Sequence, residues 1–421
     1  MRISPDIPYS ASRSEPAGTV MTCAVGFFFS FRLFIMLLSV RVLGTDPQTG
    51  VELDLALNFL LLVVVAFHSL GEVRHSFGSM LRLSSVRWVL VFLLFSGCSL
   101  LWSRTASLPA AIAYWCAMVA DVLMVALLLR AADAAGVASS LMKGFIWGAC
   151  CVALIAWIMP AQSDLRLGDE ELLGPNAIGY LCAFAFFLTQ YLIRRKEGNW
   201  SVAATFLAIT LLRSLSKTSI IAVAAGGAVV LILDKSISRK AKITLTLGLF
   251  VVIAVFWNLL ASYYGVYTNA GNQAETLTGR LGIWAYILNE ALERPWIGHG
   301  FHSVWKVIPP FGGDQFEARH AHNELLQQFY AYGMAGVLIL IGLYGSFYSQ
   351  IKKLPISPLR ALLFGLLVFV LVRGLADTEV FDLSLPLWAI VMFSIVMLES
   401  EKGGWLPGKS INMPLPEGQL V

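Results

Sequence analysis

Long runs of apolar residues, separated by short polar connections, occupy most of the chain. Runs of about 20 apolar residues are long enough to cross a hydrocarbon core of ~30 Å as a helix. The runs are continuous rather than alternating, which favours helices over a membrane β-barrel. The pattern predicts about twelve membrane-spanning helices, near residues 20–43, 51–69, 86–102, 107–129, 142–160, 173–193, 200–213, 218–233, 242–264, 323–348, 359–376 and 382–399.

The seventh and eighth predicted helices, 200–213 and 218–233, are shorter than the others. They are joined by the polar connection 213–217, so a re-entrant pair is an alternative to two full crossings. The predicted fold is therefore all-α, a polytopic transmembrane protein with one long loop on the outer side of the membrane.

The longest interruption of the apolar pattern is a polar stretch from Gly265 to Arg319. We expect one polytopic membrane domain over residues 1–399, with residues 265–322 forming a lobe of the long loop. Residues 400–421 contain a tail rich in Gly and Pro, which is typical of a disordered end. Because membrane proteins keep chemistry where charges gather at the bilayer surface, the long loop is the first place to look for function.

The composition supports a membrane class. Hydrophobic residues make up 57% of the 421 residues and charged residues only 13%, whereas soluble domains carry about 25% charged residues. The net charge of +4 comes from basic residues scattered among short connections, which gives no indication of nucleic-acid binding. All six cysteines lie in apolar runs, which argues against a disulfide framework or a zinc–thiolate site.

Lysine and arginine residues alternate between the two sets of connections and predict the orientation. The positive-inside rule places the more basic set in the cytoplasm together with both chain termini. This set consists of Arg74, Arg82, Arg87, Arg130, Lys143, Arg194, Arg195, Lys196, Lys235, Arg239, Lys240, Lys242, Lys352, Lys353 and Arg360. The long loop then faces outward, which is the periplasm if the protein lies in the inner membrane of a Gram-negative bacterium.

Basic residues on the outward side need a reason other than topology. Arg166, Arg213, Lys217 and Arg280 are among them, and binding of an anionic substrate is one such reason, with ordinary interfacial ion pairing as the alternative. Arg280 lies in the first turn of a helix that Thr278 is expected to cap. A cation is unfavourable there unless an anion is close, and either a phosphate or a carboxylate explains the position. Candidate carboxylates are Asp169, Asp377 and Glu379.

The segment His320-Ala321-His322-Asn323 precedes the tenth predicted helix. Neutral imidazole accepts a proton near physiological pH, so the paired histidines suit general-base chemistry, although a hydrogen-bonding role at the interface fits as well. His299 and His302 could join them as four imidazole ligands for zinc or copper. No carboxylate stands in a recognised metal-binding pattern with these histidines, so no metal site is expected.

At these residues the chain resembles the O-antigen ligase / Wzy-type polysaccharide polymerase superfamily. Four segments carry the resemblance: Leu215-Ser216-Lys217-Thr218-Ser219; Thr278-Gly279-Arg280 with Ile283-Trp284 and the run Arg294 to Phe301; His320 to Asn323 followed by Gly333 and Gly336; and Arg166-Leu167-Gly168 leading to Gly174 to Gly179. The order of the segments and the single long outer loop also match. The Thr-Gly-Arg, Arg-Pro-Trp and Ser-Lys-Thr-Ser versions are closest to the exopolysaccharide polymerase branch.

The resemblance implies a glycosyltransferase of the GT-C type that inverts the anomeric centre without metal, nucleotide sugar or other cofactor. Its donor would be an oligosaccharide linked to undecaprenyl diphosphate, and its acceptor a glycan or lipid A-core, with membrane lipid around it and a chain-length regulator as a possible protein partner. Arg280 and Lys217 would hold the diphosphate, with Arg166 and Arg213 as further cations. His322 would activate the acceptor hydroxyl, with His320 as the second candidate.

Asn323 and Glu379 complete the predicted site as residues that orient the histidine or bind the acceptor. Lys217 stands where many members of the superfamily have arginine, and lysine lacks the bidentate fork of a guanidinium. The superfamily contains polymerases and ligases, and the polymerase is favoured here. Two other classes remain open: a transporter or flippase for a lipid-linked glycan, and a non-catalytic assembly subunit.

Overall fold

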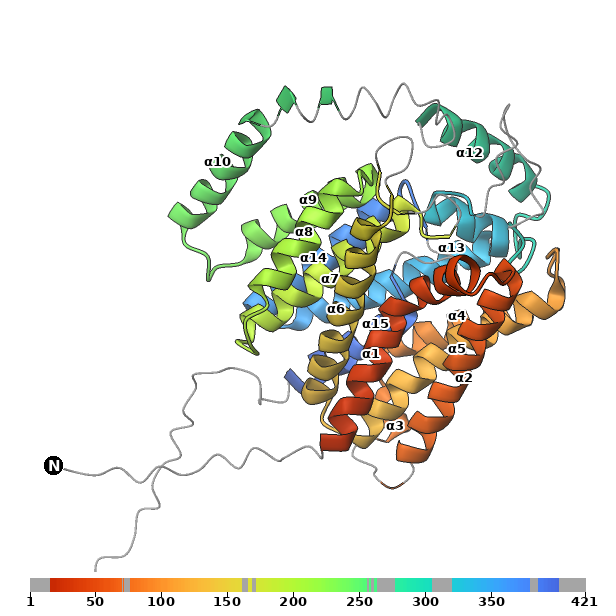
Figure 1. Ribbon diagram of the computed structural model, residues 1–421. Coiled ribbons are helices and arrows are strands. Elements are labelled where there is room, and N and C mark those ends of the chain that lie inside the picture. The colour runs from red at the N-terminus through yellow and green to blue at the C-terminus, as the bar shows by residue number, and fades with distance from the viewer. Residues whose placement is uncertain are drawn as a thin grey trace, which may run out of the picture.

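The computed structural model describes residues 16–69, 71, 76–160, 166–168, 172–255, 257–258, 261–262, 277–304, 320–378 and 385–400. Helices make up the regular elements of these residues (Figure 1). They are α1 (Pro16–Leu37), the π-helix η1 (Leu38–Val42), α2 (Pro47–Ser69), α3 (Phe77–Met80), α4 (Ser84–Ser99), α5 (Leu108–Ala131), α6 (Ala134–Ile158), α7 (Pro175–Arg194), α8 (Ser201–Arg213), α9 (Lys217–Leu233), α10 (Arg239–Val255), α12 (Leu277–Ala291), α13 (Glu324–Lys353), α14 (Pro358–Gly374) and α15 (Leu387–Glu399).

Wherever the structure describes a predicted apolar range, that range lies mainly on these helices, so the predicted all-α polytopic fold is confirmed. Among the described residues, six helices are long and apolar enough to cross a membrane: 18–42, 48–69, 108–131, 134–158, 175–194 and 324–353. Helices α4, α8, α9 and α15 are apolar but shorter. The number of twelve crossings therefore stays a prediction.

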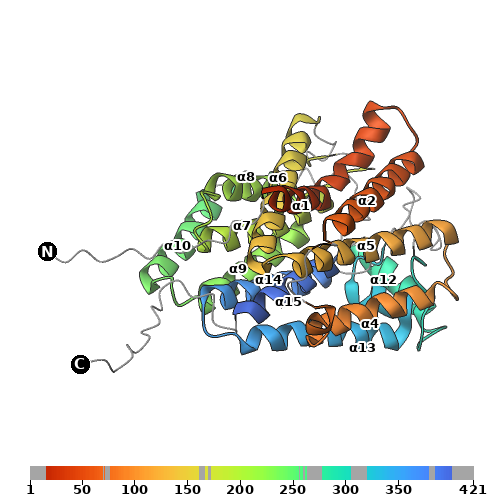
Figure 2. The same ribbon diagram turned by 90° about the horizontal axis from the view of Figure 1, so that it is seen from below.

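Glycines allow the closest helix contacts in the bundle. Helix α1 lies along α6, and a Cβ atom added at Gly144 would lie 1.8 Å from the carbonyl oxygen of Cys23. Helix α9 lies along α14, where a Cβ atom at Gly226 would lie 2.4 Å from the carbonyl oxygen of Gly365. Small residues at such contacts let membrane helices approach through their backbones. The two helix pairs are visible in Figures 1 and 2.

A buried ion pair lies inside the bundle between α1, α2 and α5. Arg32 Nη2 donates to both carboxylate oxygens of Asp121, at 2.7 and 2.8 Å, and Asn58 Nδ2 donates to Asp121 Oδ1 at 2.9 Å. Arg32 and Asp121, which are 89 positions apart in the sequence, therefore form an ion pair. Because a charge inside a membrane protein is costly unless it is paired, this contact joins α1 to α5.

Helix α13 is kinked at Gly333, whose backbone has φ 62° and ψ −154°. The segment that follows α12 fills the kink: the N–H of Met334 donates to Pro295 O at 2.7 Å, and the N–H of Gly300 donates to Ala331 O at 2.7 Å. The freed backbone groups of the kink are thus paired, as buried backbone groups must be. This pairing fixes the end of the long loop, and with it α12, against the beginning of α13.

The predicted division into a membrane domain, a loop lobe and a tail stays a prediction. Much of the expected lobe, residues 263–276 and 305–319, and nearly all of the expected tail, residues 401–421, lie outside the described residues.

Candidate active site

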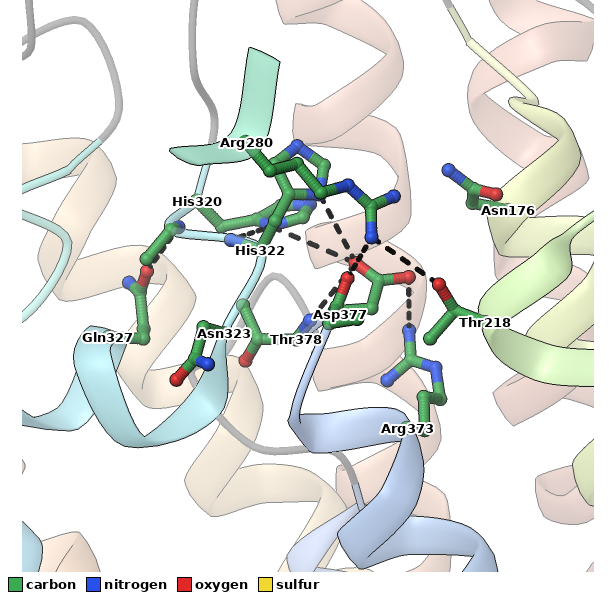
Figure 3. Close-up of polar contacts among 12 residues, drawn as sticks. Asn176, Thr218, Arg280, His320, His322, Asn323, Gln327, Arg373, Asp377 and Thr378 are labelled. Carbon is green, nitrogen blue, oxygen red and sulfur yellow. Dashed lines mark hydrogen bonds and ion pairs between the residues drawn. The ribbon is translucent and has the colours of Figure 1, made fainter. Parts of the chain in front are cut away.

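Polar side chains from three separate segments meet at one end of the bundle, where α7, α9 and α13 begin (Figure 3). The first segment is the turn before α13, with His320 and His322. The second is the first turn of α12, with Arg280. The third is the end of α14 and the residues after it, with Arg373 and Asp377.

Asp377 lies at the centre of this cluster. Its Oδ1 lies 3.4 Å from His322 Nδ1 and accepts the N–H of Thr378 at 3.0 Å, and its Oδ2 lies 3.3 Å from Arg373 Nη2. Burial by itself raises the pKa of this carboxyl, but the Arg373 guanidinium and the nearby histidines outweigh burial and hold the pKa well below its usual range. Asp377 is therefore an ionised carboxylate at neutral pH.

The two histidines differ in which ring nitrogen carries a proton. His320 Nδ1 accepts the backbone N–H of His322 at 3.2 Å, so this nitrogen carries no proton and cannot donate to Asp377 Oδ1, 4.0 Å away. Burial lowers the pKa of His320 to about 3, and the proximity of His322 lowers it further. His320 is therefore neutral under physiological conditions.

In His322 the proton is assigned to the other position, Nδ1. His322 Nδ1 lies 3.4 Å from Asp377 Oδ1 but makes no hydrogen bond to a described residue. From this proximity alone we assign the proton to Nδ1, facing the carboxylate, and the free lone pair to Nε2. The residue adopts φ 51°, a left-handed conformation that is uncommon for a side chain other than glycine. A carboxylate that orients a neutral imidazole leaves its second nitrogen ready to accept a proton.

Arg280 joins three elements. Its Nη1 donates to the carbonyl oxygen of Ala376 and to Thr218 Oγ1 at 3.4 Å in the first turn of α9. The side chain is buried, and its Nε has no hydrogen-bond partner among the described residues. Helix α12 begins at Leu277, so Arg280 lies in its first turn as predicted.

The other predicted cations lie around the α8–α9 connection. Lys217 is the first residue of α9, exposed and adjacent to Thr218, and Arg213 is the last residue of α8. Arg166 is buried and donates to Ser214 O at 3.3 Å and to Asn176 Oδ1 at 3.0 Å, which holds this connection against the start of α7. Lys217 thus lies next to the cluster, and Arg166 stabilises the α8–α9 connection by joining it to α7.

Asn323 caps α13. Its Oδ1 accepts the N–H of Leu326 at 2.9 Å, and its Nδ2 donates to Leu375 O at 2.9 Å. These contacts tie the beginning of α13 to the end of α14 and hold the two halves of the cluster together. Its role toward an acceptor stays a prediction. Glu379, the other predicted orienting residue, lies outside the described residues.

The four histidines considered as a metal set are not assembled. His299 Nε2 donates to Glu290 O at 3.0 Å and its ring stacks on Tyr330, while His302 lies 3.2 Å from Thr105 Oγ1 and stacks on Tyr114.

A different set is close enough to hold an ion. His320, His322 and Asp377 offer ligand atoms within 4.8 Å of one another. The guanidinium groups of Arg280 and Arg373 stand beside them (Figure 3), and His320 Nδ1 already accepts a backbone hydrogen bond. Two adjacent cations disfavour a metal ion and favour an anion.

A groove of about 370 Å³ runs along the flank of the bundle between α7 and α8. Phe186, Ile193, Ile209 and Leu212 are among its lining residues, and none of the lining side chains is titratable. The groove therefore lacks the groups for proton transfer, and the polar cluster is the better candidate for catalysis.

Sequence reasoning counted Arg373 among the outward-facing cations but did not select it for the site, and it considered Asp377 only as one of three carboxylates near Arg280. The two are four residues apart at the end of an apolar run, the spacing of neighbours on one helix face. That spacing, in a segment otherwise poor in charge, is the signal that could have found them.

Comparison with known proteins points to one class. The model of the O-antigen ligase family matches residues 202–341, a segment that contains Lys217, Arg280, His320 and His322. Arg373 and Asp377 lie beyond its end. Together with the helices that are long and apolar enough to cross a membrane, this match supports a multi-pass membrane protein similar to polysaccharide polymerases and ligases.

One curated relative refines this class. The chain is 23% identical over 380 residues to the exopolysaccharide production protein ExoQ of Rhizobium meliloti (strain 1021), a match that covers 83% of this chain and 84% of the relative. The predicted resemblance to the O-antigen ligase / Wzy-type superfamily, and to its exopolysaccharide branch, is confirmed.

Proposed function

We propose that the protein is a polysaccharide polymerase of the bacterial inner membrane. It takes an oligosaccharide from an undecaprenyl diphosphate carrier on the outward side and transfers it to a hydroxyl group of another glycan. One observation carries the proposal: Arg280 and His322, from separate outward segments, both contact the Ala376–Asp377 segment. An anion-binding group and a base thus stand side by side.

The reaction follows from this arrangement. His322 Nε2 takes the proton of the acceptor hydroxyl as its oxygen attacks the anomeric carbon, and the bond from that carbon to the diphosphate oxygen breaks. Asp377 stabilises the imidazolium that forms. Undecaprenyl diphosphate leaves with the bonding electron pair, and Arg280 neutralises the charge that develops on it. A single displacement of this kind inverts the anomeric centre.

Fixed cations make the departure of the leaving group favourable. A diphosphate is already a weak base, and guanidinium groups in a water-poor site stabilise its developing charge without reorganising. Lys217, exposed at the start of α9, would add a point charge to the same anion, and Arg166 and Arg213 would support the positive field. The proposed reaction therefore runs without a metal ion.

The polymerase is favoured over other activities by specific observations. The relative in exopolysaccharide production supports joining of repeat units, whereas ligation to lipid A-core is the second candidate. A transporter would need charged groups along a path through the bilayer. Arg32 and Asp121 instead form a closed ion pair that spans neighbouring helices, which does not support a transport role.

The proposal is tested with purified protein in lipid nanodiscs and an undecaprenyl diphosphate-linked oligosaccharide as the only substrate. Wild-type protein should yield glycans of several repeat units on the carrier, detected by mass spectrometry. His322→Ala should lower the rate about 10²–10⁴-fold, and Arg280→Ala about 10²–10³-fold.

The matched control is His302→Ala, which removes an imidazole outside the cluster and should leave the rate unchanged. Product only after addition of lipid A-core would establish a ligase instead. Translocation of the donor across the membrane without bond formation would support a transporter. Absence of product until a partner protein, such as a chain-length regulator, is added would contradict polymerisation by this chain alone.

A further inference from the structure

We propose that Arg373 is a second guanidinium of the donor site and binds the diphosphate of the lipid-linked substrate through Nε and Nη1. The inference rests on the proposed function and adds to it a residue that neither the family match nor the sequence motifs contain. The cluster would then bind the diphosphate with two guanidinium groups, those of Arg280 and Arg373, on either side of the segment that carries Asp377.

The position of Arg373 supports this assignment. The side chain lies at the last turn of α14 and is only 3% exposed. One nitrogen, Nη2, contacts Asp377 Oδ2 at 3.3 Å, and the guanidinium carbon lies 3.9 Å from the centroid of the Tyr180 ring. The ring covers the flat face of the guanidinium, so the N–H groups at its edge stay available for hydrogen bonds.

Two nitrogen atoms of the Arg373 guanidinium lack hydrogen-bond acceptors in the described part of the structure. They are Nε and Nη1, and both are buried. A buried charged donor without an acceptor costs free energy, so a native site that keeps such donors is expected to satisfy them with a ligand or with water. Asp377 accounts for Nη2 alone. A purely structural arginine would have needed acceptors for the other two nitrogens within the fold.

The surroundings favour an oxyanion as that ligand. Arg280 Nε, in the same cluster, is also buried and has no hydrogen-bond partner among the described residues. Both guanidinium groups therefore have N–H donors that a ligand could pair. Among the described residues, Asp377 is the carboxylate that contacts these groups, and His320 is neutral. Two cations and one carboxylate leave positive charge uncompensated, and a diphosphate offers both the charge and several acceptor oxygens.

Binding of undecaprenyl diphosphate to the full-length protein in nanodiscs, measured by titration, tests the inference. Arg373→Gln should weaken binding about tenfold or more, because charge-assisted hydrogen bonds of this kind are lost. The matched control is Arg360→Gln on the same helix, whose Nη1 donates to Leu354 O at the opposite end of α14. This variant should bind the carrier as the wild type does.

Asp377→Asn separates binding from positioning. It removes the negative charge that pairs with Arg373 but leaves the Nε and Nη1 donors in place. Binding should therefore stay as tight as in the wild type or become tighter, while turnover is lost. If Arg373→Gln behaves like Asp377→Asn, with normal binding and lost turnover, then Arg373 acts only through Asp377 and the proposal is wrong.

A second substitution, Arg373→Lys, tests the inference even if Arg373→Gln does not fold. Arg373→Lys keeps a cation beside Asp377 and is expected to fold, but it loses the fork of donors, so its affinity should fall between those of wild type and Arg373→Gln. Wild-type affinity in Arg373→Lys, together with a misfolded Arg373→Gln, would overturn the inference.

The failures of the two proposals are distinguishable. If wild-type protein does not bind undecaprenyl diphosphate at all, the proposed function fails. If the wild type binds, Arg280→Gln weakens binding and Arg373→Gln does not, only the role of Arg373 fails.

Discussion

At the scale of single residues, His320 and His322 show how two identical side chains two positions apart take different roles. His320 Nδ1 is occupied by the backbone N–H of His322, while His322 Nδ1 faces the Asp377 carboxylate. The sequence identified the pair as candidate bases but could not rank them from spacing, because the ranking depends on a carboxylate 55 positions further along the chain. Contacts of this kind support His322 as the base.

The low pKa of His320, about 3, predicts a pH dependence of stability. In the unfolded chain this histidine binds a proton below about pH 6.5, whereas in the folded protein it stays neutral down to about pH 3. The unfolded state therefore binds more protons in this window, and stability falls as the pH drops from 6.5 towards 3. Thermal unfolding in nanodiscs at pH 7 and pH 5 measures the loss.

His320→Gln is the matching variant, since glutamine keeps an acceptor and does not titrate. Its melting temperature should change less between the two pH values than that of the wild type. An equal change in both proteins would show that His320 does not contribute to the pH dependence.

At the scale of secondary structure, the apolar pattern predicted where the helices lie but not how they bend. The tenth predicted helix has a kink at Gly333, and the segment after α12 pairs with the freed backbone groups. Nothing in local spacing shows that Pro295 and Met334 would meet, because that contact depends on packing of the long loop onto α13. The first-turn position of Arg280, in contrast, is a local property and was predictable.

Gly333→Ala should destabilise the protein by about 1–3 kcal/mol, because a residue with a side chain is strained at positive φ. The added Cβ would also lie 2.4 Å from the carbonyl carbon of Trp296. The decrease in melting temperature measures the cost. Gly345→Ala, on the same helix with no atom within 4 Å of the added Cβ, should be neutral or slightly stabilising. Equal effects of both substitutions would show that the kink is not required.

The buried pair of Arg32 and Asp121 gives a second prediction for the elements. Arg32→Met leaves an unpaired carboxylate between α1 and α5 and should cost about 3–5 kcal/mol. The double substitution Arg32→Met with Asp121→Leu should recover most of that loss, as read from the fraction of folded protein after detergent extraction. A double variant as unstable as the single one would indicate that the charges themselves are needed.

At the scale of the whole molecule, composition and charge pattern predicted a polytopic helical membrane protein, and the fold agrees. The number of crossings and the orientation depend on the bilayer, and in the described part of the chain six helices are long and apolar enough by themselves. The site was predictable as a set of candidates, since Arg280, His320, His322 and Lys217 lie in recognisable motifs. Its centre at Asp377 was not, because it depends on the packing of α14 against α13 and on the contact between Arg280 of α12 and the segment after α14.

Reporter fusions test the predicted orientation. A green fluorescent protein fused after Ser238, between α9 and α10, should fluoresce because that connection carries the basic residues that stay in the cytoplasm. Alkaline phosphatase fused after Ser303 should be active, since the proposed reaction needs the polar cluster on the outward side. The reverse pattern would place the cluster in the cytoplasm and would contradict the proposed function.

The central claim is that Arg280, His322 and Asp377 form the place where a lipid-linked diphosphate is held for glycan transfer. A cryo-electron microscopy map of the protein in nanodiscs with undecaprenyl diphosphate tests it most directly. The diphosphate should lie within hydrogen-bonding distance of Arg280, with His322 facing the position of the sugar. A diphosphate bound elsewhere, for example beside the groove between α7 and α8 with the cluster unaltered, would contradict the claim.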